Sequence, residues 1–140
     1  VDMRSVNDAE ARQLAGEHNV IKAARAIQAM GPARVVIKRG EYGVMLFDGE
    51  HVFAAPAWPL EEVFDPTGAG DSFAGGFMGY VSQRGDLSLR TLRQACVAGT
   101  AIASFCVEKF SLDRFRELDQ QQIAARLAAF KALTHFDEIA

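Results

Sequence analysis

The sequence predicts an α/β protein whose strands form a largely parallel sheet. Segments with strand character alternate with segments of helical spacing along most of the chain, as they do in proteins built from βαβ units. Asparagine residues precede two of the helical segments at the N-cap position, and a β-branched run stops at a glycine. No internal repeat or linker interrupts this order, so we expect one domain or a part of one.

The first part of the chain is predicted to form a strand end followed by two helices. The stretch VDMRSVNDAEA leads into a helix over residues 7–15, with Asn7 as its N-cap and Glu10 three residues later. Asn19 is expected to cap a second helix over residues 20–30, which ends at a Gly-Pro pair. The core face of this second helix is predicted at residues with helical spacing, namely Ile21, Ala24, Ile27 and Gln28.

The middle of the chain predicts strands. The run ARVVIKRG is rich in β-branched residues and stops at Gly40, which is typical of a strand. The stretch GVMLFDGEHVFAAP then predicts a hairpin with strands at 44–47 and 51–55, because Asp48 and Gly49 are favourable turn residues.

The last part of the chain predicts three helices. A short strand at 63–64 is expected to deliver the chain into a turn over 66–70, and a Gly-rich helix follows over 71–82. A helix over 89–107 is apolar on most faces, which indicates that it is buried. The final helix, 120–132, is expected to be amphipathic through Ile123, Leu127 and Phe130.

The composition excludes several classes of function. Of the 140 residues 24% are charged, with a net charge of −3, and the basic residues are too scattered for a nucleic-acid footprint. No run of about 18 apolar residues is present, which argues against a membrane span. Cys96 and Cys106 lack the spacing of zinc ligands, so we expect reduced thiols in a cytoplasmic protein. Because the chain begins with Val1 rather than Met, we expect an upstream portion to be missing from it.

The stretch VFDPTGAGDSFAGGF contains the strongest candidate site. Gly68, Ala69 and Gly70 leave the backbone N–H groups of a turn uncovered, and glycine permits the positive φ angles that such a turn needs. N–H groups at a helix start carry partial positive charge and bind anions. Asp71 follows in the first helical turn, where a carboxylate can accept a proton from a hydroxyl beside a bound phosphoryl group. The same residues equally suit a tight turn with Asp71 as a helix cap.

Three motifs together resemble the ribokinase-like (PfkB-type) carbohydrate kinases. DPTGAGDSFAGGF is similar to the C-terminal signature of that family, VNDAEA to its Asn-x-x-Glu motif, and VVIKRGEYGVMLF to its strand–Gly-x-x-Gly–strand element. The motifs occur in the family's order and span essentially the whole chain. The resemblance implies a three-layer α/β/α, Rossmann-like fold, of which residues 1–140 form a single partial domain, the C-terminal, ATP-binding and catalytic portion.

The resemblance implies a role for each residue of the signature. Asp71 would be the catalytic base that takes the proton from the acceptor hydroxyl as that hydroxyl attacks the γ-phosphorus of ATP. The N–H groups of Gly68, Ala69 and Gly70 would form an anion hole that stabilises the charge on the transferred phosphoryl group.

Two residue pairs are implied as metal sites. Asn7 and Glu10 share one helix face, and by resemblance they would position Mg²⁺ and phosphate, largely through waters. The alternative is a plain capping pair. Asp65 and Thr67 match the first half of a monovalent-cation site found in some family members, which implies K⁺. The later region VEKFSLDRF lacks the glycine expected there, and Asp65 alone also suits a turn anchor.

The turn between the first strand and the hairpin is implied as part of the ATP site. Its residues are Lys38, Arg39, Gly40, Glu41 and Gly43. The two glycines would let the backbone approach the ribose or adenine closely, and the stems of Lys38 and Arg39 would flank the nucleotide. The alternative is a polar turn that only joins two strands.

The resemblance therefore implies ATP-dependent phosphorylation of a sugar hydroxyl, with ATP, Mg²⁺ and a small sugar or nucleoside as partners. We expect the chain alone to be inactive, because the family's acceptor contacts lie mostly upstream, and its cut sheet edge favours a homodimer. Two alternatives stay open: a nucleoside kinase with the same chemistry, and a non-catalytic, truncated nucleotide-binding module. A dinucleotide-dependent oxidoreductase is disfavoured, because the glycine spacing is wrong.

Overall fold

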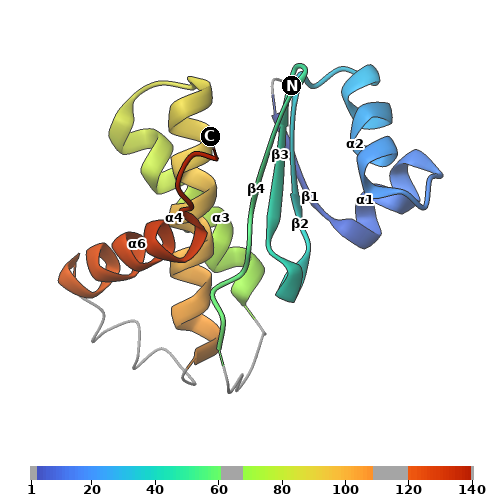
Figure 1. Cartoon of the computed structure of the whole chain (residues 1–140). Helices are drawn as coiled ribbons and strands as arrows, with labels where there is room; N and C mark the ends of the chain where they lie inside the picture. Colours follow the sequence, from blue (N-terminus) through green and yellow to red (C-terminus); the bar gives the residue numbers. More distant parts are fainter. Residues whose placement is uncertain (1–2, 61–67, 109–119, 140) are drawn as a thin grey trace. The chain divides into compact units, whose positions relative to one another are not determined.

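A four-stranded sheet is the centre of the first of two units into which the chain divides, residues 1–57 and 58–140. The computed structural model describes residues 3–60, 68–108 and 120–139. Strands β1 (Met3–Asn7), β2 (Arg34–Lys38), β3 (Val44–Asp48) and β4 (His51–Ala55) lie side by side in chain order (Figure 1). Strand β1 pairs in parallel with β2, whereas the pairs β2–β3 and β3–β4 are antiparallel.

The prediction of a largely parallel sheet is wrong for the described strands, because only the β1–β2 pair is parallel. The parallel pair is joined through helices α1 (Asp8–Ala15) and α2 (Val20–Ala29), since a parallel connection needs a long crossover. Strands β2 and β3 are joined by the short 3₁₀ helix η1 (Gly40–Tyr42), and only Gly49 and Glu50 join β3 to β4. Such short loops connect antiparallel neighbours. The predicted hairpin is confirmed, and it makes the sheet mixed.

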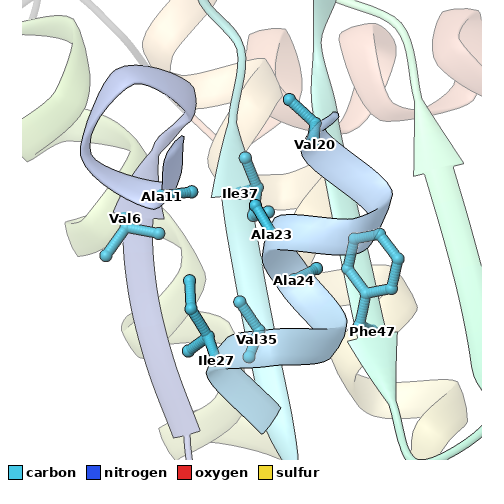
Figure 2. Packing of buried hydrophobic residues seen from close by; sticks show 9 residues of the cluster. All are labelled: Val6, Ala11, Val20, Ala23, Ala24, Ile27, Val35, Ile37 and Phe47. Carbon is cyan, nitrogen blue, oxygen red and sulfur yellow. The ribbon is translucent and has the colours of Figure 1, made fainter. Parts of the chain in front are cut away.

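Helices α1 and α2 cover one face of this sheet (Figure 1), and an apolar cluster fills the space between them and the strands (Figure 2). The cluster consists of Val6, Ala11, Val20, Ala23, Ala24, Ile27, Val35, Ile37 and Phe47. Helix α2 contributes Val20, Ala23, Ala24 and Ile27, whereas Ile21, predicted to lie in the core, is 51% exposed. Ala24 and Ile27 are thus buried as predicted, whereas Ile21 is exposed and Gln28 is half-buried. The buried stripe therefore lies closer to Val20 and Ala23 than the spacing predicted.

The second unit contains helices α3 (Ala69–Arg84), α4 (Leu89–Glu108) and α6 (Gln120–Thr134) (Figure 1). Glycines let α3 and α4 pack closely: a Cβ atom on Gly99 would lie 2.8 Å from the carbonyl oxygen of Phe73. The prediction that the long helix is buried is confirmed, because α4 carries buried residues along most of its length.

One cationic side chain joins α6 to α4. Arg126 Nη1 lies 3.0 Å from Glu108 Oε2, and the guanidinium stands 3.9 Å from the centroid of the Phe105 ring and 5.3 Å from that of Trp58. The rings of Trp58 and Phe130 lie 5.0 Å apart. Phe130 is the fully buried residue of α6, so the predicted apolar stripe is buried completely only at this position. The contacts explain why α6 docks although most of its surface is exposed.

Three predicted features lie outside the described residues, namely the strand at 63–64 and the ion-site residues Asp65 and Thr67. Within the described parts of the chain, no helix is both long enough and apolar enough to span a bilayer.

Candidate active site

Helix α3 begins without a side-chain cap. Its N-cap is Gly68, which adopts the left-handed conformation with φ 86° and has no side chain to accept a hydrogen bond. The first bond of the helix runs from Ser72 N to Gly68 O at 2.9 Å. The N–H groups of Ala69, Gly70 and Asp71 find no acceptor among the described residues. The start of α3 therefore presents several free donors together with the positive end of the helix dipole.

The helix begins two residues before the predicted start, so Ala69 and Gly70 belong to its first turn rather than to a preceding loop. Asp71 lies in the same turn, and its side chain is exposed, as are Gly68 and Gly70. A Cβ atom on Gly68 would lie 3.9 Å from the sulfur of Cys106 on α4, which is an ordinary contact. The positive φ, and not a lack of space, is thus what requires glycine at this position.

Asn7 and Glu10 form a complete capping box at the start of α1. Asn7 Oδ1 accepts from Glu10 N at 2.7 Å, and Glu10 Oε1 accepts from Asn7 N at 3.0 Å. The predicted cap is confirmed. Both side chains are exposed, and the described residues donate no hydrogen bond to the second carboxylate oxygen, Oε2 of Glu10. This oxygen suits a hydrated cation, which the capping bonds do not prevent.

The turn over residues 38–43 is closed by its own backbone. Arg39 N donates to Gly43 O at 2.7 Å, and Gly43 N donates to Gly40 O at 3.2 Å. A Cβ atom on Gly43 would collide with the carbonyl oxygen of Ala55 and lie 2.8 Å from Cα of Pro56. The chain leaving β4 thus occupies the space beside Gly43. Gly40 has φ 56° and open space beside it, so of the two glycines it is the one whose backbone a ligand can approach.

The structure does not bring Lys38 and Arg39 to the same face. Lys38 is the register partner of Val44, whereas Arg39 Nη1 lies 3.9 Å from Met45 Sδ, on the helix-covered face. Successive residues of extended backbone point in opposite directions. The two side chains therefore cannot flank one ligand as a pair. Glu41 is exposed within η1.

Among the described residues, the two clearly shifted pKa values belong to Cys96 and Asp86, neither of which is a predicted site residue. Burial raises the pKa of the Cys96 thiol from 9.0 to about 12, which makes that cysteine unreactive near neutral pH. Hydrogen bonds from Thr91 and Ser88 lower the pKa of Asp86 to about 2. Across the described ranges, no group of three or more His, Cys, Asp or Glu side chains is arranged to hold a metal ion. A cation at Asn7 and Glu10 would therefore keep most of its waters.

The predicted site residues fall in both units, with Asn7, Glu10 and residues 38–43 in the first and residues 68–71 in the second. Sequence reasoning missed one cluster, in which Arg12 and Arg39 line a cavity together with the start of α2. These residues come from separate elements, so no local motif joins them.

The fold defines the class of protein. The structure of aminoimidazole riboside kinase from Salmonella enterica superimposes with a TM-score of 0.78 at 25% identity, covering 92% of this chain and 42% of that one. Arabidopsis thaliana ribokinase, solved with ribose and ATP, gives a TM-score of 0.72 at 28% identity, with 91% and 41% of the two chains covered. The chain thus has the α/β fold of the ribokinase-like kinases. A profile of the pfkB carbohydrate kinases matches residues 1–117, so the chain belongs to the pfkB family.

A relative of known activity extends the comparison. The cytidine kinase of Thermococcus kodakarensis is 48% identical over 74 residues, which are 51% of this chain and 26% of that enzyme. The chain therefore spans well under half the length of the kinases that it matches.

Proposed function

We propose that this chain is the ATP-binding and catalytic part of a kinase that phosphorylates a hydroxyl group of a sugar or nucleoside. The observation that carries the proposal is the start of α3, where free N–H groups of Ala69 and Gly70 and the carboxylate of Asp71 lie in one exposed turn. Membership of the pfkB family supports it.

The carboxylate and the N–H groups have separate roles in the proposed reaction. Asp71 accepts the proton of the acceptor hydroxyl while the hydroxyl oxygen forms a bond to the γ-phosphorus of ATP and the bond to the ADP oxygen breaks. The N–H groups of residues 68–70 stabilise the negative charge of the phosphoryl group in transit, and such donors contribute about 3–4 kcal/mol each in comparable sites.

Residues of the first unit are proposed to bind the nucleotide and its Mg²⁺. Mg²⁺ neutralises phosphate charge when bound, and Asn7 with Oε2 of Glu10 would hold it through waters. The turn at Gly40, with Lys38 and Glu41, would meet the ribose or adenine. Arg39 lies on the face of the sheet opposite Lys38, and the space beside Gly43 is occupied by the chain leaving β4. The structure therefore offers less support for a role of these two residues at the nucleotide. Asp65 and Thr67 stay candidates for a K⁺ site.

We propose that the acceptor is a nucleoside or a sugar, and one comparison with a known protein favours each. The match to a cytidine kinase favours a nucleoside, whereas the ribokinase crystallised with ribose and ATP favours a sugar. The non-catalytic alternative has less support, because the turn from Gly68 to Asp71 keeps both the donors and the carboxylate.

The free edge of the described sheet and the cysteines suggest how the protein assembles and where it resides. Among the described strands β1 has a neighbour on one side only, so its other edge would pair with a further strand, from the rest of a kinase or from a second copy. In the absence of such a strand we expect a homodimer and no turnover. The two cysteines of the chain, Cys96 and Cys106, suit a reducing compartment such as the cytoplasm.

Phosphoryl transfer tests the proposal directly. The 140-residue chain and the longest in-frame protein that contains it, called the parent protein below, are incubated with γ-labelled ATP and with cytidine, aminoimidazole riboside, ribose or fructose. We expect the parent protein to label at least one acceptor and the chain alone to label none. A parent protein that binds ATP but labels no acceptor would refute the kinase and leave the non-catalytic binding module.

A further inference from the structure

A cavity on the first unit is lined by basic groups and by a helix start. Its walls are formed by Arg12, His18, Asn19, Val20, Ile21, Arg39 and Met45. The residues come from α1, the loop before α2, the first residues of α2, and the two ends of the β2–β3 connection. Of these residues only Arg39 was also expected at the ATP site, and its side chain lies on the face opposite that of Lys38.

Arg39 is the cationic group of the cavity that lacks a counter-charge. Its side chain is half-buried, its Nε is buried without a hydrogen-bond acceptor, and none of the described carboxylates lies within 4.0 Å of it. Its contacts are Met45 Sδ at 3.9 Å and the ring of Tyr42, whose centroid lies 5.9 Å away. Arg34 Nε is also buried without a hydrogen-bond acceptor, but Asp48 Oδ1 lies 3.6 Å from it and offsets its charge, so the two arginines differ in counter-charge. A cationic side chain without a counter-charge is unusual at a half-buried position, and a bound anion would neutralise it.

The start of α2 adds donors of a second kind. Asn19 Oδ1 accepts from Lys22 N at 3.0 Å, which satisfies one of the free N–H groups of the helix. The N–H groups of Val20 and Ile21 have no acceptor among the described residues, and both residues line the cavity. The dipole of this ten-residue helix adds partial positive charge at the same place.

The nearby carboxylates are engaged elsewhere. Asp8 Oδ2 lies 3.4 Å from Arg12 Nη1 and offsets part of its charge, and Arg12 Nε donates to His18 O at 2.9 Å. Glu17 Oε1 accepts from Asn19 N at 3.3 Å. Arg12 is thus partly neutralised, whereas the charge of Arg39 remains.

We propose that this cavity binds a tetrahedral oxyanion, either inorganic phosphate or the phosphate group of a monoester. Arg39 supplies a full charge, the N–H groups of Val20 and Ile21 supply neutral donors, and Arg12 and His18 line the same cavity. The site differs from the start of α3, which belongs to the other unit. The proposal therefore does not rest on the kinase reaction.

Amide resonances measure the binding residue by residue. The ¹⁵N-labelled 140-residue chain is titrated with sodium phosphate and, separately, with glycerol 3-phosphate, at constant ionic strength set with sodium chloride. We expect saturable shifts of the Val20 and Ile21 amides and of Arg39 Nε–H, and a tighter response to one titrant identifies the source of the phosphate. The amides of residues 69 and 70 report independently on the site proposed for catalysis. Shifts confined to them would overturn the oxyanion site of the first unit.

A matched pair of variants completes the test. Arg39→Gln removes the charge and the Nε donor, whereas Arg4→Gln removes the same charge from an exposed residue that does not line this cavity. Because a hydrogen bond to a charged group contributes about 1.5–3 kcal/mol, we expect binding about tenfold weaker or worse in Arg39→Gln and unchanged in Arg4→Gln. Equal weakening in both variants would show general charge attraction only and would overturn the proposal. The amide spectrum of each variant checks that the unit is folded.

Discussion

Helices α1, α2 and α4 begin with a polar side chain that caps them, whereas α3 begins with a bare glycine. Asn7, Asn19 and Ser88 each accept a hydrogen bond from the backbone N–H three residues later. Gly68 offers no such acceptor. Glycine at the N-cap costs only about a few tenths of a kcal/mol relative to such a side-chain cap, so the uncapped start of α3 is a small cost to the fold. Under the proposed function, the absence of a side-chain cap leaves the N–H groups of Ala69, Gly70 and Asp71 available to the transferred phosphoryl group.

Among the glycine and capping variants, the largest effect is expected from placing a side chain at the uncapped start of α3. Gly68→Ala puts a β-carbon on a residue with φ 86°, which costs about 1–2 kcal/mol, and we expect it to tilt the peptide groups that are proposed to bind the phosphoryl group. We expect turnover of the parent protein to fall about 100-fold or more.

Gly79→Ala is the matched control, because it makes the same change on the same helix in open space and at an ordinary φ. It should leave turnover intact. Equal turnover in Gly68→Ala and the parent protein would show that the bare helix start has no catalytic role.

We expect Gly43 to be required for the stability of the fold rather than for catalysis. In Gly43→Ala the new methyl group would collide with Ala55 O at a residue with φ 96°, so we expect the first unit to lose about 3 kcal/mol or more of unfolding free energy. Gly49→Ala, with φ 57° and open space, carries the backbone strain without the collision and should lose less. Denaturant unfolding of the chain measures both. Losses of the same size would mean that the chain leaving β4 does not constrain Gly43.

Removal of the side-chain caps of α1 and α2 is expected to lower the stability of the protein. Asn7→Ala and Asn19→Ala each remove one cap, and each should lower the unfolding free energy by about 1 kcal/mol. The two variants differ in one respect, because Asn7 also belongs to the proposed Mg²⁺ site. We expect Asn7→Ala alone to raise the Mg²⁺ concentration needed for half-maximal turnover of the parent protein. An identical Mg²⁺ dependence in both variants would assign Asn7 to capping only.

The smallest effect concerns the capped start of α4. Asp86 Oδ1 accepts from Ser88 N at 3.0 Å, and hydrogen bonds from Thr91 and Ser88 lower the pKa of Asp86 from 3.8 to about 2. A lowered folded-state pKa gives stability that is present above about pH 4 and is lost as the pH falls toward 2. Asp86→Asn should flatten the pH dependence of the unfolding free energy in that window. An unchanged slope between pH 4 and 2 would contradict this contribution.

Local chemistry explains which parts of the fold were predictable. The caps at Asn7 and Asn19 and the turn at Gly49 depend on residues within a few positions, so their sequence signals were sufficient. Strand direction across the sheet depends on the lengths of all connections, and the same hairpin that was predicted correctly made the sheet mixed. The exposure of Ile21 depends on how α2 is rotated against its neighbours, which the spacing alone leaves open.

The candidate site was predictable to a similar extent. The glycines and Asp71 are adjacent in sequence, so their motif predicted that they lie together at a helix start, although the helix begins at Ala69 rather than at Asp71. The opposite orientation of Lys38 and Arg39 follows from the end of β2, and the space beside Gly43 is occupied by the chain leaving β4. Both facts depend on parts of the chain that come together only in the fold.

The turnover of Asp71→Asn in the parent protein tests the central claim most directly. The asparagine keeps the size of the side chain and removes its capacity to accept the proton, so kcat should fall about 10²- to 10⁴-fold while ATP affinity changes little. Asp86→Asn makes the same substitution at the capped start of α4, where it should leave kcat unchanged. Near-normal turnover in Asp71→Asn would contradict the account, because the start of α3 would then hold no catalytic base.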